Sequence, residues 1–352
     1  MMTDELYMQR CLELAQTGIA SVSPNPMVGC VIVKGHKIIG EGYHSKFGQA
    51  HAELNAVNAV IAQYGTQAAS LLKDATVYVT LEPCAHFGKT PPCADLLIRH
   101  EVKKVVISNN DPFPDVDGKG ISKLKNAGIE VHQGVLENEC RQLNRRFFTR
   151  IEKQRPYIIL KWAQTANGYF APLNSSKQWI STPLAKRLVH KWRSEEDAIL
   201  VGKKTIIADN PQLTTREWEG KNPIRLVIDK NLEIPFEKHI YNKEAKTIVF
   251  NEVQTNVIQN IHYIQMEDMK YYLAQKIAFQ LYLMDVQSVI IEGGANILNQ
   301  FISSGLWDEA RVFNAAKNWE TGVYAPQING LITEVIPINL DKLIIYKNWQ
   351  SI

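Results

Sequence analysis

The chain has 352 residues, of which 45% are hydrophobic and 21% are charged, and its formal net charge is +3. This length exceeds what one hydrophobic core usually organises, so we expect two domains. The small net charge argues against a protein that binds nucleic acid by neutralising many backbone phosphates, although it allows a local basic pocket for one phosphate.

The first five residues include Asp4 and Glu5, where a secretory signal would carry basic residues followed by an apolar core. No apolar run is long enough to span a bilayer, so we expect a cytoplasmic protein without a membrane partner. A reducing compartment favours free thiols or metal ligands over disulfides. The number of cysteines is odd, and we expect them to be free thiols or metal ligands. They are Cys11, Cys30, Cys84, Cys93 and Cys140.

The first half of the chain alternates short apolar runs with segments of helical periodicity. Strands are predicted over residues 27–33, 37–43, 75–81 and 103–108, and helices over residues 8–15, 51–62 and 94–100. A further helix and strand over 120–131 lead to a basic helix that ends near Phe148. The alternation predicts a layered α/β domain. Because Arg155-Pro156 discourages helix, we place the boundary between 148 and 156 and divide the chain into 1–150 and 151–352.

The second half alternates in the same way. Strands are predicted over 157–163, 198–202, 224–229, 246–250 and 288–292, and helices over 186–194, 268–284 and 295–304. From Lys317 onward the period is lost, and we expect irregular structure with one returning strand near 342–346.

A set of metal-ligand residue types accompanies these elements in the first half. His51 and Glu53 begin a predicted helix, while Cys84 and Cys93 follow a predicted strand. One imidazole and two thiolates would hold Zn²⁺ with a fourth position open for water, which the metal acidifies. Glu53 lies two residues beyond the ligand His51, where its carboxylate can carry protons without binding the metal. This is the arrangement of zinc-dependent deaminases.

Other interpretations compete with this one. The cysteines could hold a purely structural zinc, although structural sites normally fill all four positions and space their cysteines more closely. His86 could be a fourth ligand, but we favour a place in the substrate site. Cys11, Cys30 and Cys140 are not in metal-ligand spacing and are interpreted as small buried hydrophobes.

Cys84 and Cys93 are separated by eight residues, whereas editing deaminases place two residues between their cysteines. This long loop, together with Pro24-Asn25-Pro26-Met27-Val28-Gly29 and Gly42-Tyr43-His44, resembles the bifunctional deaminase/reductases of riboflavin biosynthesis. The resemblance implies an N-terminal cytidine-deaminase-like three-layer domain. It also implies deamination of 2,5-diamino-6-(5-phosphoribosylamino)pyrimidin-4-one, followed by reduction of the ribosyl group to ribityl.

The same resemblance implies that Asn25 and His44 lie beside the substrate base. Asn25 stands between two prolines, so a simple turn residue is the competing interpretation. Lys89 could reach the substrate phosphate, and a solvated lysine is the alternative.

No Gly-x-Gly-x-x-Gly motif occurs, so a Rossmann dinucleotide domain is not supported. Glu292-Gly293-Gly294 follows a predicted strand and opens a helix, where free backbone N–H groups could bind a phosphate. This signal is weak alone. It gains weight from motifs that resemble the family's reductase domain in order and spacing: Lys161-Trp162-Ala163, Gln178-Trp179-Ile180-Ser181, Arg193, Ala208-Asp209-Asn210-Pro211, Leu213-Thr214-Thr215-Arg216 and Asp308-Glu309.

The resemblance implies a dihydrofolate-reductase-like α/β fold for the second domain, with NADPH as the hydride donor. The residues implied to contact this cofactor are Ala163, Trp179, Thr205, Asp209, Gly294, Ala295, Asn296, Ile297, Leu298, Asn299 and Gln300. The residues implied to contact the substrate are Arg193, Leu213, Arg216 and Glu292. Independently of any family, two arginines can bind a ribose phosphate through charge-assisted hydrogen bonds, and surface ion pairs are the competing role.

Three positions depart from the family's pattern, namely Asn167, Lys177 and Lys230. Lys177 replaces a small hydroxyl residue and could strengthen phosphate binding or point to solvent. The acid that protonates the substrate during reduction is left open among Lys161, Asp209 and Glu292.

Two other functions remain as alternatives. One is a zinc deaminase of another base or nucleoside with a degenerate C-terminal domain, against which Arg193, Arg216 and Glu292 argue. The other is a zinc-stabilised interaction protein, which would have no use for Glu53. The sequence does not decide between a monomer and a homo-oligomer.

Overall fold

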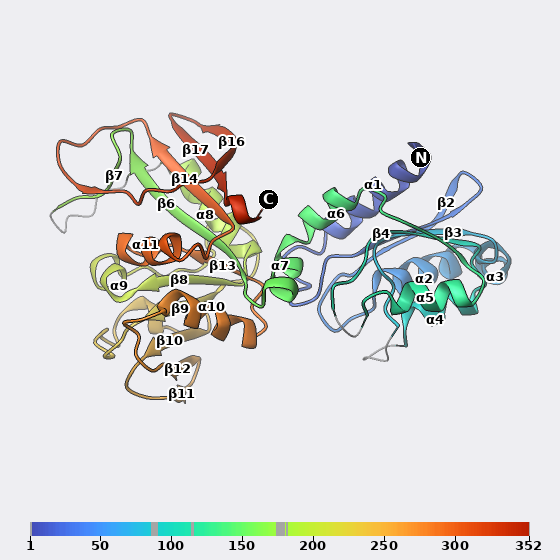
Figure 1. Ribbon diagram of the computed structural model, residues 1–352, viewed down its shortest axis with the longest axis horizontal. Coiled ribbons are helices and arrows are strands. Elements are labelled where there is room, and N and C mark those ends of the chain that lie inside the picture. Colours follow the sequence, from blue (N-terminus) through green and yellow to red (C-terminus); the bar gives the residue numbers. More distant parts are fainter. Residues whose placement is uncertain (1, 86–90, 114–115, 174–179, 181, 352) are drawn as a thin grey trace. The chain divides into compact units, whose positions relative to one another are not determined.

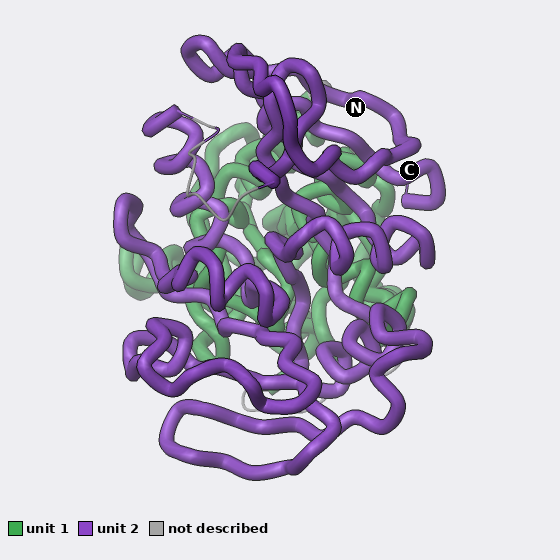
Figure 2. Tube along the Cα trace, turned by 90° about the vertical axis from the view of Figure 1, so that its left-hand side faces the viewer, with its two compact units in different colours: residues 1–154 green, residues 155–352 purple. Residues whose placement is uncertain are grey.

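The computed structural model describes residues 2–85, 91–113, 116–173, 180 and 182–351. The chain divides into two compact units, Met1–Gln154 and Arg155–Ile352 (Figure 2). The helix α7 (Arg145–Lys153) is the last helix of the first unit, which ends at Gln154.

Unit 1 contains a five-stranded sheet in the order β2-β1-β3-β4-β5 (Figure 1). β1 pairs antiparallel with β2 and with β3, whereas β3, β4 and β5 are parallel. The strands are β1 (Gly29–Lys34), β2 (Lys37–Tyr43), β3 (Thr76–Leu81), β4 (Lys104–Asn109) and β5 (Glu130–Gln133). The helices are α1 (Met2–Gln16), α2 (Ala52–Tyr64), η1 (Gly65–Gln67), α3 (Ala68–Leu72), α4 (Cys93–Arg99), α5 (Lys119–Asn126), α6 (Glu137–Leu143) and α7.

Helices cover both faces of this sheet. Successive residues of a strand point to opposite faces, so Ile32 packs with α2, α4 and α5 while Val31 packs with α1 and α6. Both sets of side chains are buried, which gives the three layers of an α/β/α sandwich. The layered α/β domain predicted for the first half of the chain is therefore confirmed.

Two glycines of β2 allow α2 to lie unusually close to the sheet. A Cβ atom on Gly42 would lie 2.3 Å from the backbone nitrogen of Ala56, and one on Gly40 would lie 2.4 Å from Val60 Cγ2. No larger residue fits at either position without moving the helix. The close contact fixes the start of α2, where His51 and Glu53 are found.

Unit 2 contains a ten-stranded sheet in the order β11-β12-β10-β9-β8-β13-β6-β14-β17-β16, together with a small β15-β7 pair (Figure 1). The strands are β6 (Tyr157–Thr165), β7 (Tyr169–Ala171), β8 (Ala198–Gly202), β9 (Ile224–Ile228), β10 (Thr247–Asn251), β11 (Asn256–Ile258), β12 (Ile261–Gln265), β13 (Ser288–Ile291), β14 (Glu309–Ala315), β15 (Val323–Tyr324), β16 (Leu331–Ile338) and β17 (Asp341–Lys347). The helices are α8 (Pro183–Glu195), α9 (Lys203–Asp209), η2 (His239–Tyr241), α10 (Leu273–Leu283), α11 (Ala295–Ser303) and η3 (Trp349–Ser351).

The central strands of this sheet are parallel from β12 through β10, β9, β8, β13 and β6 to β14. Apart from β12, they are largely buried on both faces. In β8, Leu200 packs with α10 and α11, whereas Ile199 and Val201 pack with α8. Continuous apolar strands of this kind need helices on both sides, which explains why the second half of the sequence alternates strand and helix.

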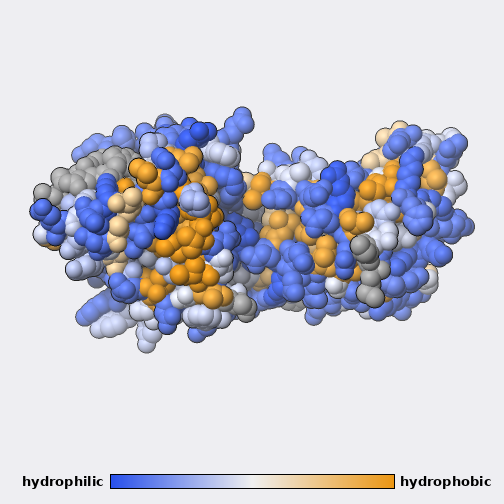
Figure 3. Space-filling view, turned by 90° about the horizontal axis from the view of Figure 1, so that it is seen from above, coloured by the Kyte–Doolittle hydropathy of each residue, from blue (hydrophilic) through white to orange (hydrophobic). Residues whose placement is uncertain are grey.

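The C-terminal stretch differs from the expectation of irregular structure with one returning strand. β16 and β17 form an antiparallel hairpin, and β17 joins the sheet beside β14. β16 escaped prediction because it is an edge strand with nearly all its residues exposed, so no buried face imposes an alternating pattern. Ile332, Val335 and Ile336 are exposed on this strand. Hydrophobic residues also gather at the surface of unit 2 on the side that Figure 3 shows.

Smaller elements also escaped prediction. These are the short strands β7, β11, β12 and β15 and the short helices α3 and α9. The longer strand β14, which is buried, was not predicted either. The basic helix expected before the boundary is two helices, α6 and α7, separated at Asn144, and α10 begins at Leu273 rather than at 268. Within the described residues, no helix is long and apolar enough to cross a membrane.

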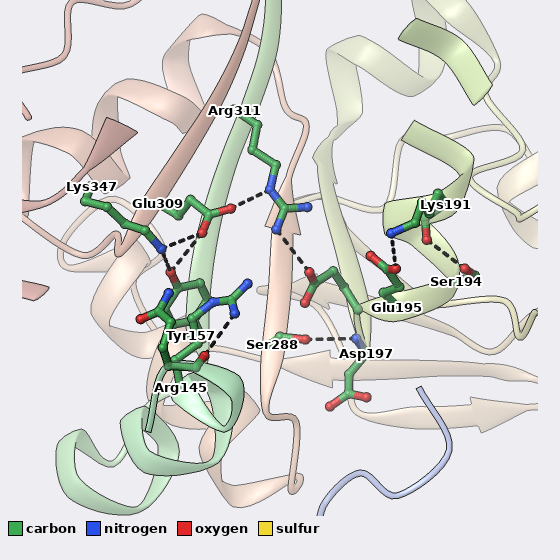
Figure 4. A network of polar contacts seen from close by, with 12 residues as sticks. Arg145, Tyr157, Lys191, Ser194, Glu195, Asp197, Ser288, Glu309, Arg311 and Lys347 are labelled. Atoms are coloured by element: carbon green, nitrogen blue, oxygen red, sulfur yellow. Dashed lines mark hydrogen bonds and ion pairs between the residues drawn. The ribbon is translucent and has the colours of Figure 1, made fainter. Parts of the chain in front are cut away.

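Unit 2 buries a group of charged side chains beside β6 and β14 (Figure 4). Glu309 accepts hydrogen bonds from Lys347 at 2.7 Å and from Arg311 at 2.5 Å, and the Arg311 guanidinium lies 3.4 Å from a Glu196 oxygen and over the Trp192 ring. Buried charges are tolerated when each has partners. The motif Asp308-Glu309 is thus explained by structure, because Asp308 also forms a bidentate ion pair with Arg155.

Candidate active sites

Three potential zinc ligands meet at one edge of unit 1. His51 is the residue before α2, Cys84 follows β3, and Cys93 is the first residue of α4. Their ligand atoms all lie within 4.8 Å of one another. The predicted ligand residues, which are 33 and 42 positions apart from the histidine, are therefore brought together by the fold.

The spacing of these atoms suits zinc. His51 Nδ1 lies 3.6 Å from Cys84 Sγ and 3.4 Å from Cys93 Sγ. Tetrahedral zinc with Zn–S of about 2.3 Å and Zn–N of about 2.1 Å would separate such atoms by about 3.6 Å. The backbone N–H of Cys93 also donates to Cys84 Sγ at 3.3 Å, which stabilises a thiolate there. Accordingly, the pKa of Cys84 is lowered to about 4, chiefly by hydrogen bonds from Cys93 and His51.

Glu53 lies in the first turn of α2, beside the three ligands. Its side chain is buried, and this burial, with the nearby Cys84 thiolate, raises its pKa to about 7. A carboxyl with a pKa near neutrality can both accept and donate a proton under physiological conditions. The residue type, burial and position suit general acid/base catalysis.

Asn25 and His44, both predicted to lie beside the base, are hydrogen-bonded to each other. Asn25 Nδ2 lies 3.1 Å from His44 Nε2, and His44 Nδ1 lies 3.1 Å from the Ala50 carbonyl oxygen. Since the carbonyl can only accept, His44 Nδ1 carries the proton and Nε2 accepts from the asparagine amide. Asn25 is thereby oriented with its amide nitrogen towards His44. Burial also lowers the pKa of His44, in agreement with a neutral ring.

In unit 2, the predicted substrate residues Arg193 and Glu292 form an ion pair, with Arg193 Nη2 2.9 Å from Glu292 Oε2. Lys161 Nζ lies 3.8 Å from the other oxygen of Glu292. Burial alone would raise the pKa of Glu292, but the charges of Arg193 and Lys161 outweigh it and lower the pKa. The site therefore combines one buried carboxylate with two cations.

The loop before Arg216 lies against the same helix α8. Arg193 Nη1 lies 3.5 Å from the Thr214 carbonyl oxygen, and Arg216 Nη1 donates to Thr214 Oγ1 at 2.9 Å. Burial and the neighbouring Arg193 charge lower the pKa of Arg216. Leu213 is buried in the core beneath the loop, in a left-handed backbone conformation. Two guanidinium groups thus face one region, which favours an anion.

The segment predicted to bind the cofactor lies where β8 and β13 end. Gly294 is the residue before α11, and a Cβ atom added to it would lie 3.7 Å from Thr205 Oγ1. A Cβ on Gly202, at the end of β8, would lie 2.4 Å from Ile297 Cδ1. Small residues therefore allow α9 and the start of α11 to approach. Ala163 lies on β6, and Asp209 is the last residue of α9.

Models of known families match both units. The cytidine and deoxycytidylate deaminase zinc-binding region matches residues 1–109, and the RibD C-terminal domain matches residues 156–317. The riboflavin biosynthesis protein RibD of Aquifex aeolicus is 42% identical over 318 residues, covering 89% of this chain and 87% of that protein. The chain belongs to the RibD family of riboflavin biosynthesis.

Solved structures of the RibD family agree with this assignment. A diaminohydroxyphosphoribosylaminopyrimidine deaminase/5-amino-6-(5-phosphoribosylamino)uracil reductase from Thermotoga maritima superposes with a TM-score of 0.89 at 34% identity, covering 99% of both chains. RibD of Acinetobacter baumannii, form 1, gives a TM-score of 0.87 at 34% identity, covering 98% of this chain and 99% of the other.

Family membership confirms several predictions from the sequence. The protein is a bifunctional deaminase and reductase, with a cytidine-deaminase-like domain followed by a reductase domain of the dihydrofolate-reductase fold. The deaminase region is of the zinc-binding type, and the reductase domain implies a nucleotide cofactor. The predicted residues His86, Lys89, Lys177 and Trp179 lie outside the described part of the chain.

Two buried polar residues near these sites were not predicted. Glu82, two residues before Cys84, is buried and accepts four backbone hydrogen bonds from residues 111, 118, 120 and 121. His190, on α8, accepts a hydrogen bond from the backbone N–H of Arg216. His190 stands one helical turn before Arg193, and this spacing was the only signal in the sequence that could have revealed it.

Proposed function

We propose that unit 1 deaminates 2,5-diamino-6-(5-phosphoribosylamino)pyrimidin-4-one, with zinc held by His51, Cys84 and Cys93. The observation that carries this proposal is the buried carboxyl of Glu53 beside three correctly spaced ligands. A site that only stabilised the fold would need no such carboxyl. When bound, zinc would supply a water molecule with a pKa near 7.

Glu53 is the proton carrier of this reaction. Water attacks the pyrimidine carbon that bears the 2-amino group, and the carbon–nitrogen bond then breaks to release ammonia. Glu53 accepts a proton from the attacking water and passes it to the adjacent ring nitrogen. It then accepts the remaining proton of the added hydroxyl and delivers it to the departing amine, so that ammonia leaves and a carbonyl forms. Its raised pKa, about 7, suits both directions of transfer.

Asn25 positions the pyrimidine. Because the Asn25 amide nitrogen donates to His44, its carbonyl oxygen is available to accept a hydrogen bond from an N–H of the base. His44 holds that orientation through its own bond to the Ala50 carbonyl. The site would therefore prefer a base that presents an N–H group to the Asn25 carbonyl oxygen.

Unit 2 then reduces the ribosyl group of 5-amino-6-(5-phosphoribosylamino)uracil to ribityl with NADPH as hydride donor. Thr205 and the segment from Gly294 to Gln300 bind the cofactor, with Ala163, Trp179 and Asp209 as further contacts. Backbone N–H groups at the start of α11 suit a cofactor phosphate.

Arg193 and Arg216 bind the substrate phosphate, and Leu213 and Glu292 complete the substrate site. The lowered pKa of Arg216 beside Arg193 supports an anion between the two guanidinium groups. Lys177 is a further candidate for the phosphate. Lys161, beside Glu292, is the best-placed candidate for the proton donor, since burial lowers its pKa.

A coupled assay tests the whole proposal. The purified protein is given the diaminopyrimidine substrate with and without NADPH. We expect ammonia release in both cases and NADPH oxidation only after deamination. Ammonia release without any oxidation of NADPH, even when the deaminated substrate is supplied, would show that the second unit is not a working reductase.

A further inference from the structure

The loop that carries Arg216 is attached to α8 by a histidine. His190 Nδ1 lies 3.2 Å from the backbone nitrogen of Arg216 and accepts its hydrogen bond. The histidine side chain is buried at 1% exposure, whereas Arg216 and the residues after it to Gly220 are exposed. This bond therefore ties the backbone of an exposed segment to a buried side chain of α8.

The bond fixes the chemical state of His190. A backbone N–H can only donate, so Nδ1 carries no proton and the neutral ring bears its proton on Nε2. If both ring nitrogens were protonated, Nδ1 and the backbone nitrogen of Arg216 would both be donors, and no hydrogen bond could form between them. Burial, followed by the charges of Arg193 and Arg216, lowers the pKa of His190 to about 4. Other charged groups near it are Glu292 and the ion pair of Lys186 with Glu217.

His190 and Arg193 share one face of α8, since they are three residues apart. Arg193 contacts the Thr214 carbonyl, and His190 holds the backbone of Arg216 two residues later. The two guanidinium groups therefore have their relative position set by one helix and one short loop. The residues on either side of Arg216 are held as well, because Thr215 bonds to Asn222 and Glu217 pairs with Lys186. The backbone of Arg216 itself is held by His190, and its side chain bonds to Thr214 Oγ1.

We infer that His190 is a positioning residue for phosphate recognition, which acts by holding the backbone of Arg216 so that its guanidinium faces the phosphate together with Arg193. The inference rests on the proposed function, in which these arginines bind the substrate phosphate. Because the phosphate is bound alike before and during hydride transfer, loss of the bond should weaken substrate binding more than it slows turnover.

The test compares His190→Leu, which fills the buried space without an acceptor, with His190→Asn, whose side-chain oxygen can take the place of Nδ1. Reduction kinetics are measured with 5-amino-6-(5-phosphoribosylamino)uracil and with its dephosphorylated form. We expect His190→Leu to raise KM for the phosphorylated substrate about tenfold with little change in kcat, because part of a charge-assisted contact is lost. His190→Asn should restore most of the affinity, and KM for the dephosphorylated substrate should not change.

Arg216→Ala and His262→Leu complete the set, the latter as a histidine on β12 that takes no part in the site. The double variant His190→Leu/Arg216→Ala should have the same KM as Arg216→Ala alone. His262→Leu should leave KM at the wild-type value. If Arg216→Ala abolishes the preference for the phosphorylated substrate while His190→Leu retains it, the inference about His190 is overturned and the phosphate site stands. If Arg216→Ala retains the preference, the proposed phosphate site is itself wrong, and the role of His190 falls with it.

A structural role for His190 would give a different pattern. His190→Leu would then lower kcat or the melting temperature and affect both substrates equally. His190→Asn would also show no difference in its effect on the phosphorylated and dephosphorylated substrates. That outcome also overturns the inference, since it removes the link to the phosphate.

Discussion

Glu53 is buried next to three metal-ligand side chains, and its burial raises its pKa to about 7. Replacing it with glutamine keeps the shape of the side chain but removes the proton carrier. We predict that Glu53→Gln lowers the rate of deamination at least about 100-fold. Zinc content and reduction of the deaminated substrate should stay at the wild-type level. A variant that deaminates at a near wild-type rate would exclude Glu53 from proton transfer.

The five cysteines divide into ligands and core residues. Cys84 and Cys93 lie beside His51, whereas Cys11, Cys30 and Cys140 are buried in apolar clusters of unit 1. We predict that Cys84→Ser and Cys93→Ser each sharply reduce bound zinc, because a neutral hydroxyl is a poor substitute for a thiolate. Cys30→Ser is the matched control and should keep full zinc, measured by elemental analysis of the purified proteins. Full stoichiometry in either ligand variant would contradict the assignment.

Residues with a distinctive chemistry were the ones that the sequence could predict. His51, Glu53, Cys84 and Cys93 belong to residue types that zinc deamination requires, so their spacing alone indicated the site. Glu82 and His190 carry no such signature. Their partners are backbone N–H groups 26 to 39 positions away, and only the fold shows which loop each one holds.

Among the elements, α5 begins without a capping side chain of its own. Gly118, the residue before it, has a left-handed conformation, and Glu82 from the end of β3 accepts the N–H groups of Gly118, Gly120 and Ile121 instead. A carboxylate can accept at both oxygens, whereas an amide can accept at only one.

We therefore predict that Glu82→Gln destabilises unit 1 by about 2–4 kcal/mol, since it leaves buried N–H groups without an acceptor. Denaturant unfolding of the zinc-loaded protein measures this loss. Glu101→Gln serves as the control, because Glu101 is exposed and forms a surface ion pair with Lys73. Equal stability of Glu82→Gln and Glu101→Gln would show that the cap contributes little.

Most strands that are buried on both faces were predicted, although β14 was not, and the exposed edge strands β11 and β16 were missed. The predicted buried strands appear in the sequence as short apolar runs because helices cover them on both sides. They are β1, β3, β4, β6, β8, β9, β10 and β13. β11 and β16 lie at the two ends of the ten-stranded sheet and are almost wholly exposed. Backbone hydrogen bonds to one neighbouring strand hold them in place, and these bonds do not require an alternating pattern of apolar and polar residues in the sequence.

At the scale of the whole molecule, two cores account for a chain of this length. The buried clusters around β1–β4 consist of unit 1 residues, and those around β6, β8 and β13 consist of unit 2 residues. Alternating strands and helices predicted two α/β domains, but the pattern could not identify the reductase fold. That assignment needed the family motifs, because many α/β folds share the same alternation.

Separate cores lead to a prediction about metal removal. The three ligands belong to unit 1 and connect the start of α2, the segment after β3 and the start of α4, so zinc should stabilise that unit alone. Treating the full-length protein with a chelator should abolish deamination and increase hydrogen exchange in α2 and α4. Reduction of the deaminated substrate with NADPH should persist, and exchange in β6, β8 and β13 should not change. Added zinc should restore deamination, whereas loss of reduction in parallel with the metal would show that the reductase site depends on the zinc centre.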